Sequence, residues 1–496
     1  MAPSLLDQVV QATVAAAHSA ATVLDQLRAA PTRGARLALW LGLAPGDPVP
    51  SGAAIRARLA VDLARLDALL SAQVDAILHH PRFQELEAAW RGVALVVEAA
   101  RDVELVKVRL LHASWRELAR DLGGAIEFDQ SQLFRKVYSA EFGSPGGEPF
   151  GLLVGDFAVR HAPEAGHPID DVATLAAAAQ VAAAAFAPLL VGAAPSLLGL
   201  ESFADLERPI DVARPFAQPD HVAWNALRRS PDARFLGVCL PRVLLRRPWR
   251  DDPARADGFR YEEDASAPDR SSYLWGNAAF ALAAVVIRSV GESGLPIAMR
   301  GLPADGSGGR VDDLAVDWIS TETHPRVAKP VTEVAVSDAR EQELVPLGLM
   351  PLCHVHGDTL AAFHAAPSLQ QPATFDDPTA TANARISSML HYILCVSRFA
   401  HHLKVMARDR VGSLSTPEEW EAVLNRWLRD YSNGNPNAGY ETLARQPLRE
   451  ARAKVEESPG KPGSYRCVIH LCPHFQLDQM AASVRLETEL VSATRQ

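Results

Sequence analysis

Two groups of cysteine, histidine and aspartate side chains have spacings that could hold a metal ion. In the first, Cys353, His354, His356 and Asp358 are close in sequence, and the two histidines would point the same way from a strand. Such a pattern occurs in binuclear metal sites of hydrolases, but there another histidine directly follows the aspartate, and position 359 is threonine. The segment predicts a hairpin around residues 357–358. A metal-dependent hydrolase using His354, His356 and Asp358 is the alternative.

The second group is Cys467, His470, Cys472 and His474. On a strand the last three could share one face, whereas Cys467 would point to the other face. Tetrahedral closure around zinc would then need a bulge. We therefore expect ordinary strand and turn residues and no metal.

The sequence has no motif that anchors nucleotide binding or a common hydrolase mechanism. Gly-x4-Gly-Lys-Ser/Thr, Gly-x-Gly-x-x-Gly after a strand, His-Glu-x-x-His and Gly-x-Ser-x-Gly are all absent. The acidic runs at 262–264 and 376–377 lie beside proline, glycine or aromatic residues, as solvated turns do. The chain is predicted to have no catalytic residues, to need no cofactor and not to be an enzyme.

Four arginines form a local basic run around Pro248-Trp249. They are Arg242, Arg246, Arg247 and Arg250. Such a run could bind an acidic protein surface, and the alternative is a solvated loop. It is the best candidate for a charged contact patch.

Composition places the chain among soluble proteins that do not coat nucleic acid. Its 496 residues carry a net charge of −10, which opposes a general affinity for nucleic acid or anionic membranes. Five cysteines are few and odd in number, which favours a reducing compartment and a cytoplasmic protein. The uncharged stretch 172–200 is rich in alanine and broken by prolines, so it predicts a buried helix over 172–187 followed by a loop, not membrane insertion.

The N-terminus predicts a helical arm. Leu6, Val10 and Leu24 belong to an apolar stripe over residues 4–30, and Pro31 ends this helix. Three prolines and two glycines within 44–52 then form a linker. Residues 1–52 are therefore predicted to be an arm and linker. The alternative is a helix docked on the body, because the same apolar stripe suits either arrangement.

The middle of the chain alternates helical and strand patterns, which predicts an α/β fold with a parallel or mixed sheet covered by helices. We expect helices over 53–100, 114–122, 172–187 and 275–290, and strands over 103–111, 151–157, 235–240 and 297–300. The hairpin strands are expected over 352–356 and 359–363. This α/β body is assigned to residues 53–375.

Residues 376–496 predict a separate α+β part. A long helix is expected over 379–408, and Thr416 caps another over 417–430. Two strands with alternating apolar and polar residues follow over 465–472 and 484–490. These strands either finish a sheet of this chain or add to that of a neighbour.

Many collinear motifs resemble one family, the large sheath subunit of type VI secretion systems (TssC/VipB). They begin with Ile-Leu-His-His-Pro-Arg-Phe-Gln at 77–84 and Phe-Asp-Gln-Ser-Gln-Leu-Phe at 128–134. Glu-Phe-Gly-Ser-Pro-Gly-Gly at 141–147, Leu-Trp-Gly-Asn-Ala-Ala-Phe at 274–280 and Pro-His-Phe-Gln-Leu-Asp at 473–478 continue the series. The resemblance extends from about residue 70 to 490.

The resemblance implies a structural role in a contractile machine. Such subunits pair with a small sheath subunit (TssB/VipA-like), assemble in six-fold helical rings around an Hcp tube on a baseplate, and contract without nucleotide. The sheath of a phage-tail-like extracellular contractile device shares these mechanics and is the alternative.

The resemblance also implies two sets of partner-binding residues. Strands shared between neighbouring protomers would include Cys467, Ile469, Leu471, Val484, Leu486 and Leu490. In some family members the N-terminal helix is captured by a ClpV-type AAA+ unfoldase, for which Leu6, Val9, Val10 and Leu24 would be the anchors.

Overall fold

The structure is a computed structural model. It describes residues 25–44, 47–48, 50–144, 146–252, 254, 258–265, 270–302, 308–320, 327–355, 359–409, 416–435, 438–457, 464–474 and 484–491. The chain divides into two compact units. The first comprises Met1–Val74 and Asp251–Tyr261, and the second comprises Asp75–Arg250 and Glu262–Gln496.

In its described part, the first unit is mostly helical. Residues 25–29 are helical and the helix ends before Pro31, as predicted; residues 1–24 of the predicted arm lie outside the described residues. Helix α2 (Arg33–Leu41) begins where the Thr32 side chain accepts a hydrogen bond from the Ala35 N–H at 3.2 Å. Most of α3 (Gly52–Leu78) also belongs to this unit, and none of its 27 residues is buried.

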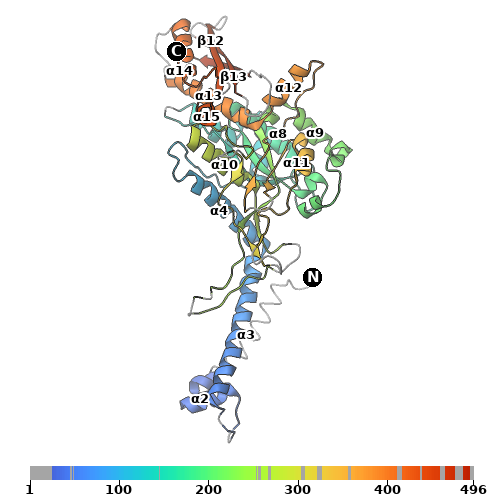
Figure 1. Ribbon diagram of the computed structural model, residues 1–496, viewed down its shortest axis with the longest axis vertical. Helices are drawn as coiled ribbons and strands as arrows, with labels where there is room; N and C mark the ends of the chain where they lie inside the picture. Colours follow the sequence, from blue (N-terminus) through green and yellow to red (C-terminus); the bar gives the residue numbers. More distant parts are fainter. Residues whose placement is uncertain are drawn as a thin grey trace. The chain divides into compact units, whose positions relative to one another are not determined.

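A four-stranded parallel sheet forms the centre of the second unit (Figure 1). Its strands are β1 (Leu153–Val159), β2 (Leu189–Ala193), β3 (Leu236–Leu240) and β9 (Leu349–Pro351), in the order β1-β2-β3-β9. Helices α8 (Asp171–Ala185) and α10 (Ala278–Ser293) cover it. In β2, Val191 packs with Leu175 of α8, whereas Leu190 packs in another cluster with Leu282 of α10. This alternation makes a helix-sheet-helix sandwich, so the predicted fold class is confirmed.

The C-terminal part of this unit packs two helices on an antiparallel sheet. Helices α13 (Leu390–Asp409) and α14 (Pro417–Asp430) bury Phe399 and Leu424 against β12 (Leu448–Glu457) and β13 (Ser464–Pro473). Strand β14 (Val484–Val491) completes the order β12-β13-β14.

The remaining helices and strands connect these layers. The helices are α4 (Pro81–Ala100), α5 (Trp115–Gly124), α6 (Gln132–Phe134), α7 (Ala140–Phe142), α9 (Val222–Arg229), α11 (Asp338–Leu344), α12 (Pro378–Ser387) and α15 (Tyr440–Arg445). The strands are β4 (Val243–Arg246), β5 (Leu274–Gly276), β6 (Arg310–Val311), β7 (Trp318–Ile319), β8 (Val327–Ala328), β10 (Cys353–His354) and β11 (Ala361–Ala362).

Several predicted elements are confirmed. The helices over 114–122, 172–187, 275–290 and 417–430 correspond to α5, α8, α10 and α14, and Thr416 caps α14 by accepting the Glu419 N–H at 3.3 Å. The strands over 151–157 and 235–240 correspond to β1 and β3. The predicted hairpin pairs β10 with β11, although residues 356–358 lie outside the described part.

Two long predicted helices are each broken. The helix over 53–100 divides before Pro81 into α3 and α4, because a residue before proline disfavours the α conformation. The helix over 379–408 divides into α12 and α13 because the backbone there pairs with another segment: the Ser388 carbonyl accepts the Ser368 N–H, and the Leu390 N–H binds the Ala366 carbonyl at 2.9 Å.

Two strand predictions and one loop prediction are wrong. Segments 103–111 and 297–300 form no strand in the described chain. The predicted loop after α8 contains β2, whose buried apolar run lacks alternation because both of its faces are covered. No helix among the described residues is long and apolar enough to cross a membrane.

Candidate assembly surfaces

Strand β13 lies at the centre of the C-terminal sheet. Cys467 is aligned with Val455 of β12 on one side and with Thr488 of β14 on the other. The side chains of Cys467, Ile469 and Leu471 are buried in the cluster beneath the sheet. Both edges of β13 are therefore paired within the chain, and its apolar side chains serve the core.

The outer edge of β12 is closed by side chains of α14. The Asn425 amide donates to the Ala453 carbonyl and accepts the Ala453 N–H, both at 2.9 Å. Two residues further along the same edge, the Val455 N–H donates to the Glu421 carboxylate at 3.2 Å. Helix α14 thus occupies backbone groups that another strand would otherwise use.

The opposite edge of the sheet is the outer edge of β14. Its backbone is aligned with β13 from Val484 (opposite Leu471) to Val491 (opposite Ser464), and no other described strand pairs with it. An edge strand of this kind presents alternating N–H and C=O groups to an incoming strand. The predicted residues Val484, Leu486 and Leu490 lie on this strand.

A second surface is the apolar stripe on α4. Phe83, Leu86, Trp90 and Val97 recur three, four and seven residues apart, and all are exposed, Trp90 to 61%. The opposite face packs on α10, where Gly92 allows close approach: a Cβ there would lie 2.2 Å from the Phe280 ring. One face of α4 thus stabilises the body, and the other has the heptad spacing that receives a partner helix.

The segment 103–111 follows α4 and is also exposed. Leu105, Leu110 and Leu111 are 72%, 63% and 53% exposed. Lys107 and Arg109 form ion pairs with Glu148 and Glu141, which hold the segment on the body. Its alternating sequence, which predicted a strand, has no partner strand in the described chain.

The predicted basic run is largely neutralised within the chain. Arg242 binds Glu333 through two hydrogen bonds of 2.7 and 2.6 Å, and Arg250 binds Asp317 at 2.9 Å. Arg247 is exposed, and no ion pair joins it to another described residue. The run is not a free cationic patch, although a contact of Arg247 with an acidic partner stays a prediction.

Arg246 is instead a buried structural residue. Its guanidinium bonds Glu87 at 2.8 Å and Glu263 at 3.0 Å, and Glu263 also accepts the Trp249 N–H at 2.9 Å. Burial alone would raise the pKa of Glu263, but the hydrogen bonds from Arg246 and Trp249 outweigh it and lower this pKa. The network ties α4 to β4.

The other predicted site residues do not gather. Six of them lie outside the described residues: His356, Asp358, Leu6, Val9, Val10 and Leu24. His474 contacts the Asn433 carbonyl and Cys472 accepts from Arg449, so these two side chains of the second candidate metal group face different partners. The Cys353 Sγ lies 3.7 Å from a carboxylate oxygen of Glu341, a residue outside the predicted group.

Comparisons with known proteins cover most of the chain. A family model described as EvpB/VC_A0108, tail sheath N-terminal domain (VipB), matches residues 61–370, and its gpW/gp25-like companion matches residues 379–490. The chain is 39% identical over 434 residues to the type VI secretion system sheath protein TssC1 of Pseudomonas aeruginosa PAO1, which covers 87% of this chain and 85% of that protein. A solved chain in the anti-feeding prophage baseplate has 11% identity, 62% and 65% coverage, and a TM-score of 0.31, which is too low to carry an argument.

Proposed function

Since this chain belongs to the EvpB/VipB family of tail-sheath proteins, we propose that it is the large sheath subunit of a type VI secretion system. In this role it pairs with a small sheath subunit, polymerises around an Hcp-type tube on a baseplate in the cytoplasm, and contracts. The observation that carries the proposal is that both sheath domains match in order along one chain.

We propose that the open edge of β14 links neighbouring protomers by strand addition. The closed edge of β12 supports this assignment, because Asn425 and Glu421 leave β14 as the available side of the sheet. Main-chain hydrogen bonds give such a linkage affinity. A link made at one strand lets the bodies rotate as rigid units during contraction.

We propose that the small subunit docks on the α4 stripe and on segment 103–111. The stripe offers an anchor of large exposed side chains, Trp90 and Leu86, and tryptophan is enriched among residues that dominate interface energies. The neighbouring segment offers a strand-like sequence without a strand partner. A helix and a strand of the partner would cover both.

The N-terminal arm is proposed to recruit an AAA+ unfoldase of the ClpV type through Leu6, Val9, Val10 and Leu24. These residues belong to one apolar side of the predicted helix. Deleting residues 1–30 is expected to leave sheath assembly intact and to abolish unfoldase capture in a pull-down. Unchanged capture would contradict this role.

Co-expression with the small subunit tests the proposal as a whole. We expect the two chains to co-purify and to form hollow tubules in electron micrographs. Trp90→Ala should lower the binding free energy between the two subunits by about 2 kcal/mol or more, which reduces co-purification. The fold should stay intact, because Trp90 is exposed in the free chain. Arg82→Ala, an exposed change at the start of the same helix, is the matched control. Chains that purify separately and form no tubules would contradict the function.

A further inference from the structure

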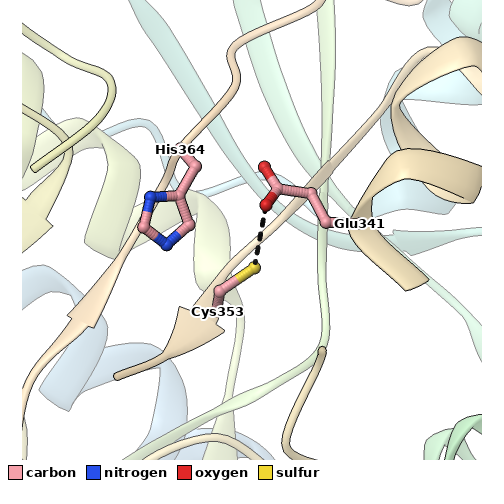
Figure 2. A group of neighbouring side chains, drawn as sticks. All are labelled: Glu341, Cys353 and His364. Atoms are coloured by element: carbon pink, nitrogen blue, oxygen red, sulfur yellow. Dashed lines mark hydrogen bonds between the residues drawn. The ribbon is translucent and has the colours of Figure 1, made fainter. Parts of the chain in front are cut away.

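Three side chains with metal-binding donors meet at one place in the second unit. Glu341 comes from α11, Cys353 from β10 and His364 from the segment directly after β11 (Figure 2). The Cys353 Sγ lies 3.7 Å from the Glu341 carboxylate, and one donor atom of each residue lies within 4.8 Å of the others. A sulfur, a nitrogen and an oxygen donor therefore converge from three elements.

The register of the hairpin explains why His364 reaches Cys353. Cys353 is aligned with Ala362 across the antiparallel pair, so both side chains lie on one face. His364 is two residues beyond Ala362 and returns to that face, whereas Phe363 between them is fully buried on the other.

Helix α11 is fixed so that Glu341 covers this face. The Ser337 side chain caps the helix by accepting the Arg340 N–H at 3.3 Å, and Leu344 is buried in the core at the last turn. Arg340 is turned away, with hydrogen bonds to the Ile210 and Arg208 carbonyls at 2.7 Å. The third donor thus has a defined position.

We propose that Glu341, Cys353 and His364 bind one zinc-class divalent cation that ties α11 to the β10–β11 hairpin. Zinc accepts sulfur, nitrogen and oxygen ligands, whereas magnesium and calcium favour oxygen ligands alone. Zinc–sulfur bonds of about 2.3 Å and zinc–oxygen bonds of about 2.0 Å put tetrahedral ligands about 3.5 Å apart, close to the Sγ–carboxylate separation.

Binding involves no redox change. The Cys353 S–H bond breaks, its proton passes to solvent, and the sulfur lone pair forms the bond to the metal. His364 contributes a neutral ring nitrogen, Glu341 a carboxylate oxygen, and water the fourth ligand. Every proposed ligand comes from this chain, so metal binding can be tested without the small sheath subunit.

Titration of the full chain with Co²⁺ alone, after treatment with a chelator, tests the site. We expect one Co²⁺ per chain with a thiolate-to-cobalt charge-transfer band, and displacement of this band by Zn²⁺. C353A should lose the band, and H364Q should weaken binding about tenfold or more. Far-UV circular dichroism checks that both variants fold, and His364 is only half-buried, so H364Q tests the site even where C353A is unstable.

Cys472→Ser and His470→Gln are the matched controls, because they come from the other cysteine–histidine group. Both should bind Co²⁺ like the unmodified chain. Absence of the band in the unmodified chain, an unchanged band in C353A, unchanged affinity in H364Q, or loss of the band in either control would overturn the proposal.

Discussion

The two edges of the C-terminal sheet differ in what satisfies their backbone groups. At β12, Asn425 and Glu421 of α14 bind the outward N–H and C=O groups of Ala453 and the outward N–H of Val455. At β14, no described strand pairs with the outer edge. The same small sheet thus has one edge protected against pairing and one edge available for it.

This difference distinguishes an edge that is protected against pairing from an edge that is available for assembly. Exposed strand edges are a hazard because any extended segment can pair with them, and proteins cover the edges that they do not use. Here the cover comes from a helix that also builds the core, through Leu424 and Leu428. A sheet with one edge closed and the other without a described strand partner favours a specific use of the second edge, which we propose to be strand addition between protomers.

The largest expected effect on stability comes from removing the support of the closed edge. Leu424 is 1% exposed, so Leu424→Ala should lower the free energy of unfolding by about 2–5 kcal/mol, through lost burial and a cavity. Denaturant unfolding measures the loss. Arg426→Ala, on the exposed side of α14, should change it by about 0.5 kcal/mol or less. Equal losses in both variants would show that α14 does not anchor the edge.

A smaller effect is expected from opening the closed edge directly. Asn425→Ala removes both hydrogen bonds to Ala453 and should cost about 1–3 kcal/mol of unfolding free energy. The freed edge should also promote concentration-dependent self-association, which light scattering detects. Asn425→Asp keeps the acceptor for the Ala453 N–H and should give an intermediate effect. An Asn425→Ala protein that stays monomeric at all concentrations would remove the contrast between the edges.

The smallest expected effect is a loss of unfolding free energy in acid, through the packing of α13 on α8. The His401 ring on α13 donates to the Ala185 carbonyl of α8 at 2.9 Å, and burial lowers the pKa of His401 to about 3. Because this folded-state pKa lies below the unfolded value, the neutral ring stabilises the fold above about pH 6.5 and that stability is lost as pH falls. Between pH 7.5 and 5.5 the loss should be about 1 kcal/mol.

His401→Gln isolates this contribution, since glutamine keeps a donor for Ala185 but does not titrate. Its unfolding free energy, measured at both pH values, should fall less than that of the unmodified chain. An identical pH dependence in the two proteins would assign the acid sensitivity to other groups.

Sequence patterns predicted the elements with a strong local signal. Helix α8 follows from its uncharged, alanine-rich run, α14 from its capping residue Thr416, and the strand pair over 465–472 and 484–490 from alternation. Strand β2 was not predicted because a strand buried on both faces lacks alternation. Strand β12 was not predicted because its alanine and charged residues give a weak alternating apolar pattern. The break at Ser388 depends on pairing with residues 366–368, which no local pattern encodes.

The assembly surfaces were predictable in part. The two terminal strands were recognisable as strands. Which edge of the sheet is closed depends on Asn425, whose contact with Ala453 spans 28 residues of sequence. The α4 stripe could have been found from its heptad spacing, whereas its exposure required the structure. Likewise, the sequence does not distinguish Arg246 from the other arginines of the basic run. Its burial and its ion pairs with Glu87 and Glu263 follow from tertiary packing.

Replacement of Arg485 on β14 tests the central claim most directly. Arg485→Pro removes a backbone donor from the edge strand, whereas Arg485→Ala changes the side chain alone. With the small sheath subunit co-expressed, we predict that Arg485→Pro retains the heterodimer and a normally folded body but forms no tubules in electron micrographs, while Arg485→Ala forms them. Normal tubules from Arg485→Pro would contradict the assignment of the open edge to protomer linkage.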